Sequence, residues 1–231
     1  PRTPPYPIRR LQTQIAISEV PIQVAGLPTL GIADSTLTSI GFKADGPILI
    51  AGPQQSGRTN AVRWLAESMH RRWPSLPLVH LTGRLSPLSG LDLWRVRASG
   101  AADVADKLER LIEIAGTPAG AEPAVAIVVE YLTDFVGTSS ESALAELVKT
   151  CRRNGNPIIA EGETSTWGGL WPVISEVRNA RTGLLLQPDQ SDGDNLLRTS
   201  LPRIKRADFP PGRGFWIAGG KASKVQLPLM E

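Results

Sequence analysis

The stretch Pro47–Thr59 (PILIAGPQQSGRT) decides the fold of this chain. Its first part, Ile48-Leu49-Ile50, is apolar throughout, as expected of a strand buried on both faces of a sheet. Two glycines follow, Gly52 and Gly57, and behind them come a basic residue and a threonine. Glycine allows a sharp turn and the close approach of a ligand, and the N–H groups of such a loop and of the next helix surround an anion. The stretch therefore predicts a strand, a phosphate-binding loop and the start of a helix.

The spacing is that of the P-loop, G-x-x-x-x-G-K-[ST], with Arg58 in the place of the lysine. A guanidinium is wider and planar, so Arg58 would attract a phosphate with a changed geometry. Thr59 would offer its hydroxyl to Mg²⁺. A glycine-rich turn of another α/β fold is the alternative interpretation. The residues predicted to bind a nucleotide are Gly52, Gln54, Gln55, Ser56, Gly57, Arg58, Thr59 and Asn60.

A second motif follows the apolar run Ala124–Val129 (AVAIVV), a predicted strand. Glu130 stands where a P-loop ATPase normally has the aspartate that holds the metal, and it is the only catalytic candidate. Tyr131 occupies the position of the acid that polarises the attacking water, and a phenol with a pKa near ~10 is a poor base. Asp134 could replace that acid only if the loop curls back, and otherwise is a solvated turn residue or helix cap. We expect ATP and Mg²⁺ as the cofactors, if any, with little or no hydrolysis.

Three further charged residues follow predicted core strands. Glu161 comes after Pro157–Ala160, where related ATPases have a polar sensor, and a surface carboxylate is the alternative. Arg178 and Arg181 flank the last core strand and could be finger or sensor arginines, but we expect structural salt bridges for both.

The histidines and tryptophans carry weaker signals. His70 and His80 stand alone, without metal-ligand spacing. Trp167 and Trp171 are expected to be core or interface anchors, or to line a groove for a peptide.

Strands and helices alternate along most of the chain, which predicts an α/β fold with a mostly parallel sheet and helices on both faces. A hairpin-like turn is expected at Lys43–Gly46, because it contains an Asp-Gly pair between Thr36–Phe42 and Pro47–Ala51. Further strands are predicted at Leu76–Leu81, Gly183–Leu186 and, as short edge strands, at Phe215–Ala218 and Val225–Leu227; helices are predicted at Arg58–Trp73, Ala101–Ala115, Ser140–Arg153 and Leu170–Asn179.

Composition allows one domain and gives no strong indication of a partner. The 231 residues carry a net charge of +3, too small to argue for nucleic acid. Basic residues gather between Arg198 and Lys224, where the only acid is Asp208, and this segment could meet a phosphate backbone or an acidic protein, or be a solvated tail. The single cysteine, Cys151, fits a reducing cytoplasm, and no apolar run approaches the ~18 residues of a membrane-spanning helix. The basic residues of the segment are Arg198, Arg203, Lys205, Arg206, Arg213, Lys221 and Lys224.

Four stretches resemble the FtsK/SpoIIIE family of motor ATPases, and within it the C-terminal ATPase domain of the type VII secretion motors EccC and EssC. They are Pro47–Thr59, Ala126–Tyr131, Ala180–Asp194 (ARTGLLLQPDQSDGD), and Pro210–Gly214 with Val225–Pro228. The resemblance implies a RecA/FtsK-like P-loop fold over residues 31–231, with residues 1–30 as a linker and edge strand from the upstream part of a longer protein. It also implies further ATPase domains upstream, a membrane anchor elsewhere that places this soluble fragment at the cytoplasmic face of the membrane, and the other subunits of a hexameric motor as partners.

Three functions are weighed. The first is a degenerate ATPase-fold module of a type VII secretion motor, with weak or absent nucleotide binding, that recognises the C-terminal signal of small helical secreted proteins or regulates the motor. The second is an ATP-driven DNA translocase of the FtsK type, which the weak site argues against and the basic segment Arg198–Lys224 favours. The third, a small-molecule kinase, lacks a lid-like arginine cluster or nucleoside pocket. We therefore expect protein rather than DNA as the partner.

Overall fold

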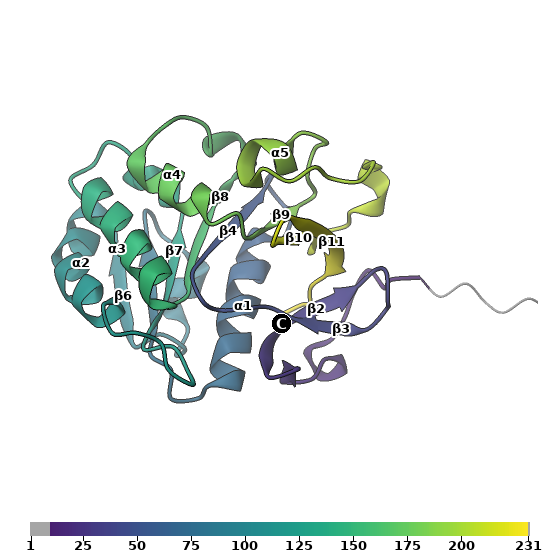
Figure 1. The fold of residues 1–231 in the computed structure, drawn as a ribbon, viewed down its shortest axis with the longest axis horizontal. Helices are drawn as coiled ribbons and strands as arrows, with labels where there is room; N and C mark the ends of the chain where they lie inside the picture. The colour runs from purple at the N-terminus through teal and green to yellow at the C-terminus, as the bar shows by residue number, and fades with distance from the viewer. Residues whose placement is uncertain (1–9, 231) are drawn as a thin grey trace, which may run out of the picture.

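The computed structural model describes residues 10–230, which form one sheet of eleven strands with helices on both faces (Figure 1). The strand order is β1-β2-β11-β10-β9-β4-β8-β7-β5-β6, and β3 pairs with β2 outside this path. The strands are β1 (Gln23–Val24), β2 (Leu27–Ala33), β3 (Ser39–Gly41), β4 (Pro47–Gly52), β5 (Leu78–Thr82), β6 (Val96–Ser99), β7 (Ala126–Glu130), β8 (Ile158–Glu163), β9 (Gly183–Leu186), β10 (Arg213–Ala218) and β11 (Lys221–Gln226).

The six strands from β9 to β6 are all parallel and form one side of the sheet, which ends at the edge strand β6. Strand β4 lies between β8 and β9, with Leu49 opposite Ala160 on one side and Gly183 on the other. Every residue of β4 is buried, as its apolar run predicted. The mostly parallel α/β sheet expected from the alternation of elements is therefore confirmed.

The alternating side chains of β4 define the two layers of core. Ile48 and Ile50 pack in the cluster that contains the buried side of α1 (Arg58–Arg72), including Trp64. Leu49 and Ala51 pack in the cluster formed with α2 (Ala101–Ala115), α3 (Glu141–Asn154) and α4 (Pro172–Asn179). These three helices lie side by side in Figure 1.

The predicted hairpin at Lys43–Gly46 is wrong. Strand β3 pairs with β2, with Ser39 opposite Ile32, whereas both edges of β4 are occupied by parallel neighbours. An Asp-Gly pair favours a tight turn, but here the two segments that it joins belong to different parts of the sheet.

The prediction of edge strands near the C-terminus is also wrong. Strand β10 pairs with β9 and β11, and β11 pairs with β2, with Val225 opposite Ala33. Strand β2 from the N-terminal part of the chain therefore pairs with β11, which local sequence predicted to be at the edge of the sheet. Strands β2 and β6 and the short helix α5 (Asp192–Leu197) were not predicted.

The N-terminal residues are joined to the domain by polar contacts and by the core. Strand β2 crosses the boundary expected between residues 30 and 31, and its backbone accepts hydrogen bonds from α1: Trp64 Nε1 to the Leu30 carbonyl at 2.7 Å and Ser68 Oγ to the Thr29 carbonyl at 2.7 Å. Ile15 and Val20 are buried in the α1 cluster. Residues 1–9 of the expected linker lie outside the described residues.

Candidate functional site

The glycine-rich loop has the tight geometry that its sequence predicts. It connects β4 to the first turn of α1, with Gly57 at φ 97°. A Cβ at Gly52 would lie 2.4 Å from Ser56 Oγ, and one at Gly57 would lie 2.8 Å from the amide nitrogen of Gly212. Neither position has room for a side chain. Ser56 is fully buried in this turn, and its hydroxyl has no hydrogen-bond partner among the described residues.

Arg58 forms an ion pair with Glu161, since its Nη1 lies 2.8 Å from Glu161 Oε1. The two side chains are 14% and 3% exposed. The contact is not an aligned hydrogen bond, because Nη1 is buried and has no hydrogen-bond partner within residues 10–230. Glu161 was expected to follow a strand, but it lies inside the longer β8, opposite Ile50 of β4. This register places its carboxylate beside the loop.

The second oxygen of Glu161 accepts a hydrogen bond from the backbone N–H of Tyr131 at 3.0 Å. Burial raises the pKa of the Glu161 carboxyl, while this N–H and the Arg58 charge act in the opposite direction. Burial also raises the pKa of Tyr131, helped by the charges of Glu130 and Glu161. The phenol is therefore an even poorer base at neutral pH than its ordinary pKa implies.

Glu130 is held by residues of the neighbouring β5 region. Its Oε2 lies 2.6 Å from His80 Nε2 and 2.5 Å from Ser86 Oγ, and the whole residue is 1% exposed. The His80 ring stacks on Trp94 with centroids 4.9 Å apart. The polar His80 within the apolar strand LVHLT was a signal for a buried partner, but its pairing with Glu130 was missed. Thr59, the other predicted metal ligand, is exposed in the first turn of α1.

Asp134 lies close to Tyr131, but its carboxylate is paired with Arg84. Arg84 donates to both of its carboxylate oxygens, with Nε 2.6 Å from Oδ2 and Nη2 2.5 Å from Oδ1. The same guanidinium lies 4.5 Å from the centre of the Tyr131 ring. Within residues 10–230, no group of three or more His, Cys, Asp or Glu side chains is arranged to hold a metal ion.

A cleft of about 420 Å³ opens beside the loop, and it was not predicted. The Gly212 N–H donates to the Ser56 carbonyl at 2.9 Å, which joins the C-terminal segment to the loop. Asn60, a predicted nucleotide ligand, donates from Nδ2 to the Pro228 carbonyl at 2.9 Å and accepts from the Met230 N–H at 2.7 Å. The cleft is lined by Thr13, Gln14, Gly57, Asn60, Pro210, Pro211, Gly212, Gln226, Leu227 and Leu229.

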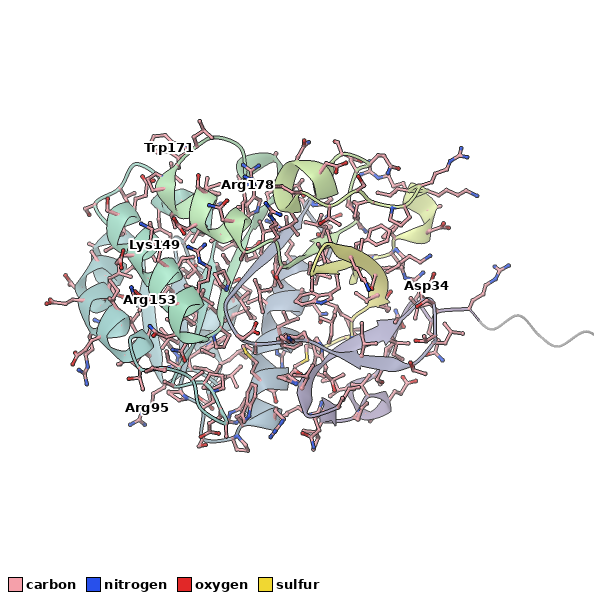
Figure 2. All side chains as sticks on the ribbon, in the orientation of Figure 1. Asp34, Arg95, Lys149, Arg153, Trp171 and Arg178 are labelled. Atoms are coloured by element: carbon pink, nitrogen blue, oxygen red, sulfur yellow. The ribbon has the colours of Figure 1, made fainter. Side chains whose placement is uncertain are left out.

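The contacts described for the remaining candidate residues do not involve the glycine-rich loop. Arg178 donates to the Asn195 carbonyl, which ties α4 to α5. The salt bridges predicted for Arg178 and Arg181 are wrong within residues 10–230, because neither forms an ion pair there. Trp167 is fully buried, whereas Trp171 is 48% exposed (Figure 2) and its neighbour Leu170 is 93% exposed. Arg181 is exposed, with φ 51°.

The basic segment is divided by the fold. Arg213 is buried and Lys224 pairs with Asp34 at 2.8 Å. The other basic side chains of the segment are exposed: Arg198, Arg203, Lys205, Arg206 and Lys221.

A glycine loop between a central parallel strand and a helix, with strands on both sides of that strand and helices on both faces, defines a P-loop NTPase fold. The chain shares this fold with solved structures of the type VII secretion ATPase EccC and of the conjugation coupling protein TcpA. It is homologous to the ATPase domains of the type VII secretion motors EccC and EssC.

These relationships rest on comparisons along nearly the whole chain. It is 22% identical over 253 residues to the ESX secretion system protein EccC of Geobacillus thermodenitrificans, covering 98% of this chain and 17% of that protein. EccC ATPases 2 and 3 of Thermomonospora curvata, solved with a signal sequence peptide, superpose with a TM-score of 0.77 at 19% identity, covering 97% of this chain and 45% of that one. EssC ATPases 2 and 3 of Geobacillus thermodenitrificans give a TM-score of 0.73 at 19% identity, over 98% and 46%.

The chain thus spans about a sixth of its curated relative and less than half of these solved structures. No protein-family model matches it. Within residues 10–230, no helix is both long and apolar enough to cross a membrane.

Proposed function

We propose that this chain is an ATPase-fold module of a type VII secretion motor that turns over ATP negligibly and acts in substrate recognition or in regulation of the motor. The observation that carries the proposal is the ion pair between Arg58 and Glu161 in the P-loop. In this pair Glu161 neutralises the Arg58 guanidinium, the cation that should bind the outer phosphates of a nucleotide. Tyr131 supplies no base for the attacking water, because its pKa is raised.

The residues present fit a phosphate better than they fit a metal ion. The buried Ser56 Oγ, which has no hydrogen-bond partner within residues 10–230, and the guanidinium of Arg58 are groups suited to an oxyanion, and a cleft of about 420 Å³ opens beside Gly57. A bound Mg²⁺ would neutralise phosphate charge, with Thr59 as its ligand. Glu130 would have to leave His80 and Ser86 to contribute. We therefore propose weak binding of ATP.

The relatives support the choice of partners. One solved structure contains EccC ATPases 2 and 3 with a signal sequence peptide. This chain covers less than half of that EccC chain and less than half of the corresponding EssC chain. We propose that this chain likewise adjoins other ATPase domains of one polypeptide in a membrane-anchored, hexameric motor at the cytoplasmic face. We also propose that it contributes to binding the C-terminal signals of small secreted proteins.

The experiment is a steady-state ATPase assay of the purified protein with Mg²⁺, beside calorimetric titration with ATP. We expect a rate far below about 1 s⁻¹, at the lower end of ordinary enzyme turnover. The double variant Arg58→Lys/Tyr131→Glu should gain affinity more than rate, because it restores the compact ammonium group of the ordinary P-loop while Glu130 stays paired with His80. Thr59→Ala is the control that removes the metal-binding hydroxyl and leaves the loop glycines unchanged. Turnover at or above 1 s⁻¹ by the unmodified chain would refute the proposal.

A further inference from the structure

The two guanidiniums near the P-loop already have carboxylate partners before any ligand arrives. Two carboxylates, Glu130 and Glu161, and two guanidiniums, Arg58 and Arg84, act on the ring of Tyr131 between them. Arg84 is paired with Asp134, Glu130 with His80, and Arg58 with Glu161. The positive charge that a P-loop normally directs at a phosphate is therefore cancelled by a carboxylate of the same domain.

The position of Glu161 is fixed by the pairing of its strand, since the residue does not lie on a flexible surface loop. It sits in the middle of β8, with Ile50 of β4 as its register partner, and its Oε2 accepts the Tyr131 N–H. A carboxylate that is 3% exposed needs a counter-charge, which Arg58 provides. A phosphate entering the loop would bring a second anion beside it, and two like charges at this distance disfavour each other.

The loop nevertheless keeps one free hydroxyl for an oxyanion. Ser56 Oγ is buried inside the turn and has no hydrogen-bond partner within residues 10–230, whereas Arg58 Nη1 is held in the ion pair with Glu161. Buried polar groups are normally hydrogen-bonded, so this hydroxyl is suited to donate to an oxyanion that enters the loop.

We propose that Glu161 is a built-in counter-anion of the P-loop, and that the loop takes a phosphoryl group only when this carboxylate releases Arg58. The inference rests on the proposed phosphate site, whether or not the domain acts in secretion. Glu161 is here a positioning residue that sets the affinity for phosphate esters by occupying the arginine that they need.

The test is calorimetric titration of the full chain with pyrophosphate and with ATP, without added metal. Glu161→Gln keeps the size of the side chain and removes its charge, so we expect binding about tenfold tighter or more than for the unmodified chain. Glu109→Gln, at an exposed position of α2, makes the same change of charge outside the loop and its neighbouring strands, and as the control it should leave the affinity unchanged. The double variant Arg58→Gln/Glu161→Gln should lose the gain, because the released guanidinium is its source.

Three results would overturn the inference: no gain for Glu161→Gln, an equal gain for Glu109→Gln, or a gain that persists without Arg58. Failure of every variant to bind either ligand would also remove the proposed phosphate site. Tight binding by the unmodified chain, equal to that of Glu161→Gln, would refute only the counter-anion. If Glu161→Gln does not fold, Glu161→Asp serves instead. Its shorter carboxylate loosens the contact with Arg58 and should give a smaller gain of the same sign.

Discussion

At the scale of single residues, burial controls the chemistry of Cys151. The side chain is fully buried on α3, and desolvation raises the pKa of its thiol to about 12, from an ordinary value of 9.0. The unfolded thiol therefore loses its proton at a lower pH than the folded one, so the free energy of unfolding falls as the pH rises from about 9 towards about 12. We expect the native protein at pH 8 to resist labelling by a thiol reagent, and to react fully once unfolded in urea. Rapid labelling without denaturant would contradict this, and Cys151→Val, which should lack this part of the alkaline loss, is the control.

At the scale of elements, Arg213 fastens the β10–β11 hairpin to the N-terminal chain. It is buried and donates to Gln226 Oε1 at 3.0 Å, to the Leu11 carbonyl at 3.1 Å and to the Gln12 carbonyl at 2.7 Å. Arg213→Ala would leave these acceptors without a donor, so we expect a loss of about 2–4 kcal/mol in urea unfolding. The same variant should increase proteolysis near residues 10–14. Lys221→Ala, exposed on the same hairpin, should change stability by less than about 0.5 kcal/mol; an equal effect of both would show that Arg213 has no special role.

At the scale of the whole molecule, the exposed basic residues test whether DNA is a partner. Arg203, Lys205 and Arg206 are exposed, and the segment is fixed by Gln190, which accepts the Ile204 N–H at 3.1 Å. We expect binding of duplex DNA no tighter than about 1 μM at physiological salt, falling steeply as salt rises because each neutralised phosphate releases counterions. A helical signal peptide held by apolar anchors should depend much less on salt.

The measurement is a titration with labelled duplex DNA and with a candidate signal peptide at two salt concentrations. The triple variant Arg203→Ala/Lys205→Ala/Arg206→Ala should abolish the weak DNA binding. Lys149→Ala/Arg153→Ala, on α3 (Figure 2), removes charge elsewhere and is the control. Submicromolar DNA binding at physiological salt that only the triple variant abolishes would favour a DNA translocase instead.

Local patterns were enough to predict the strands of the parallel part of the sheet except β6. The apolar run and the glycine loop of Pro47–Thr59 form β4 and the turn into α1, and the predicted ranges of α2 and β9 agree with the structure at both ends. These features depend on neighbours in sequence, namely the periodicity of apolar side chains and the positions of glycine. The binding of a nucleotide at the loop stays a prediction.

Only the tertiary structure decided which partners the site residues have. Glu161 meets Arg58 and Glu130 meets His80 because β8 lies beside β4, and β5 beside β7, in a given register. In the same way, β10 and β11 are interior strands because β2 pairs with β11. Apart from β2, β6 and α5, the sequence alone determined where the strands, the helices and the loop form, since those choices follow from residues a few positions apart. The charge balance of the loop depends on strands more than 100 residues apart, and the strand order that joins them follows from burial of the whole chain.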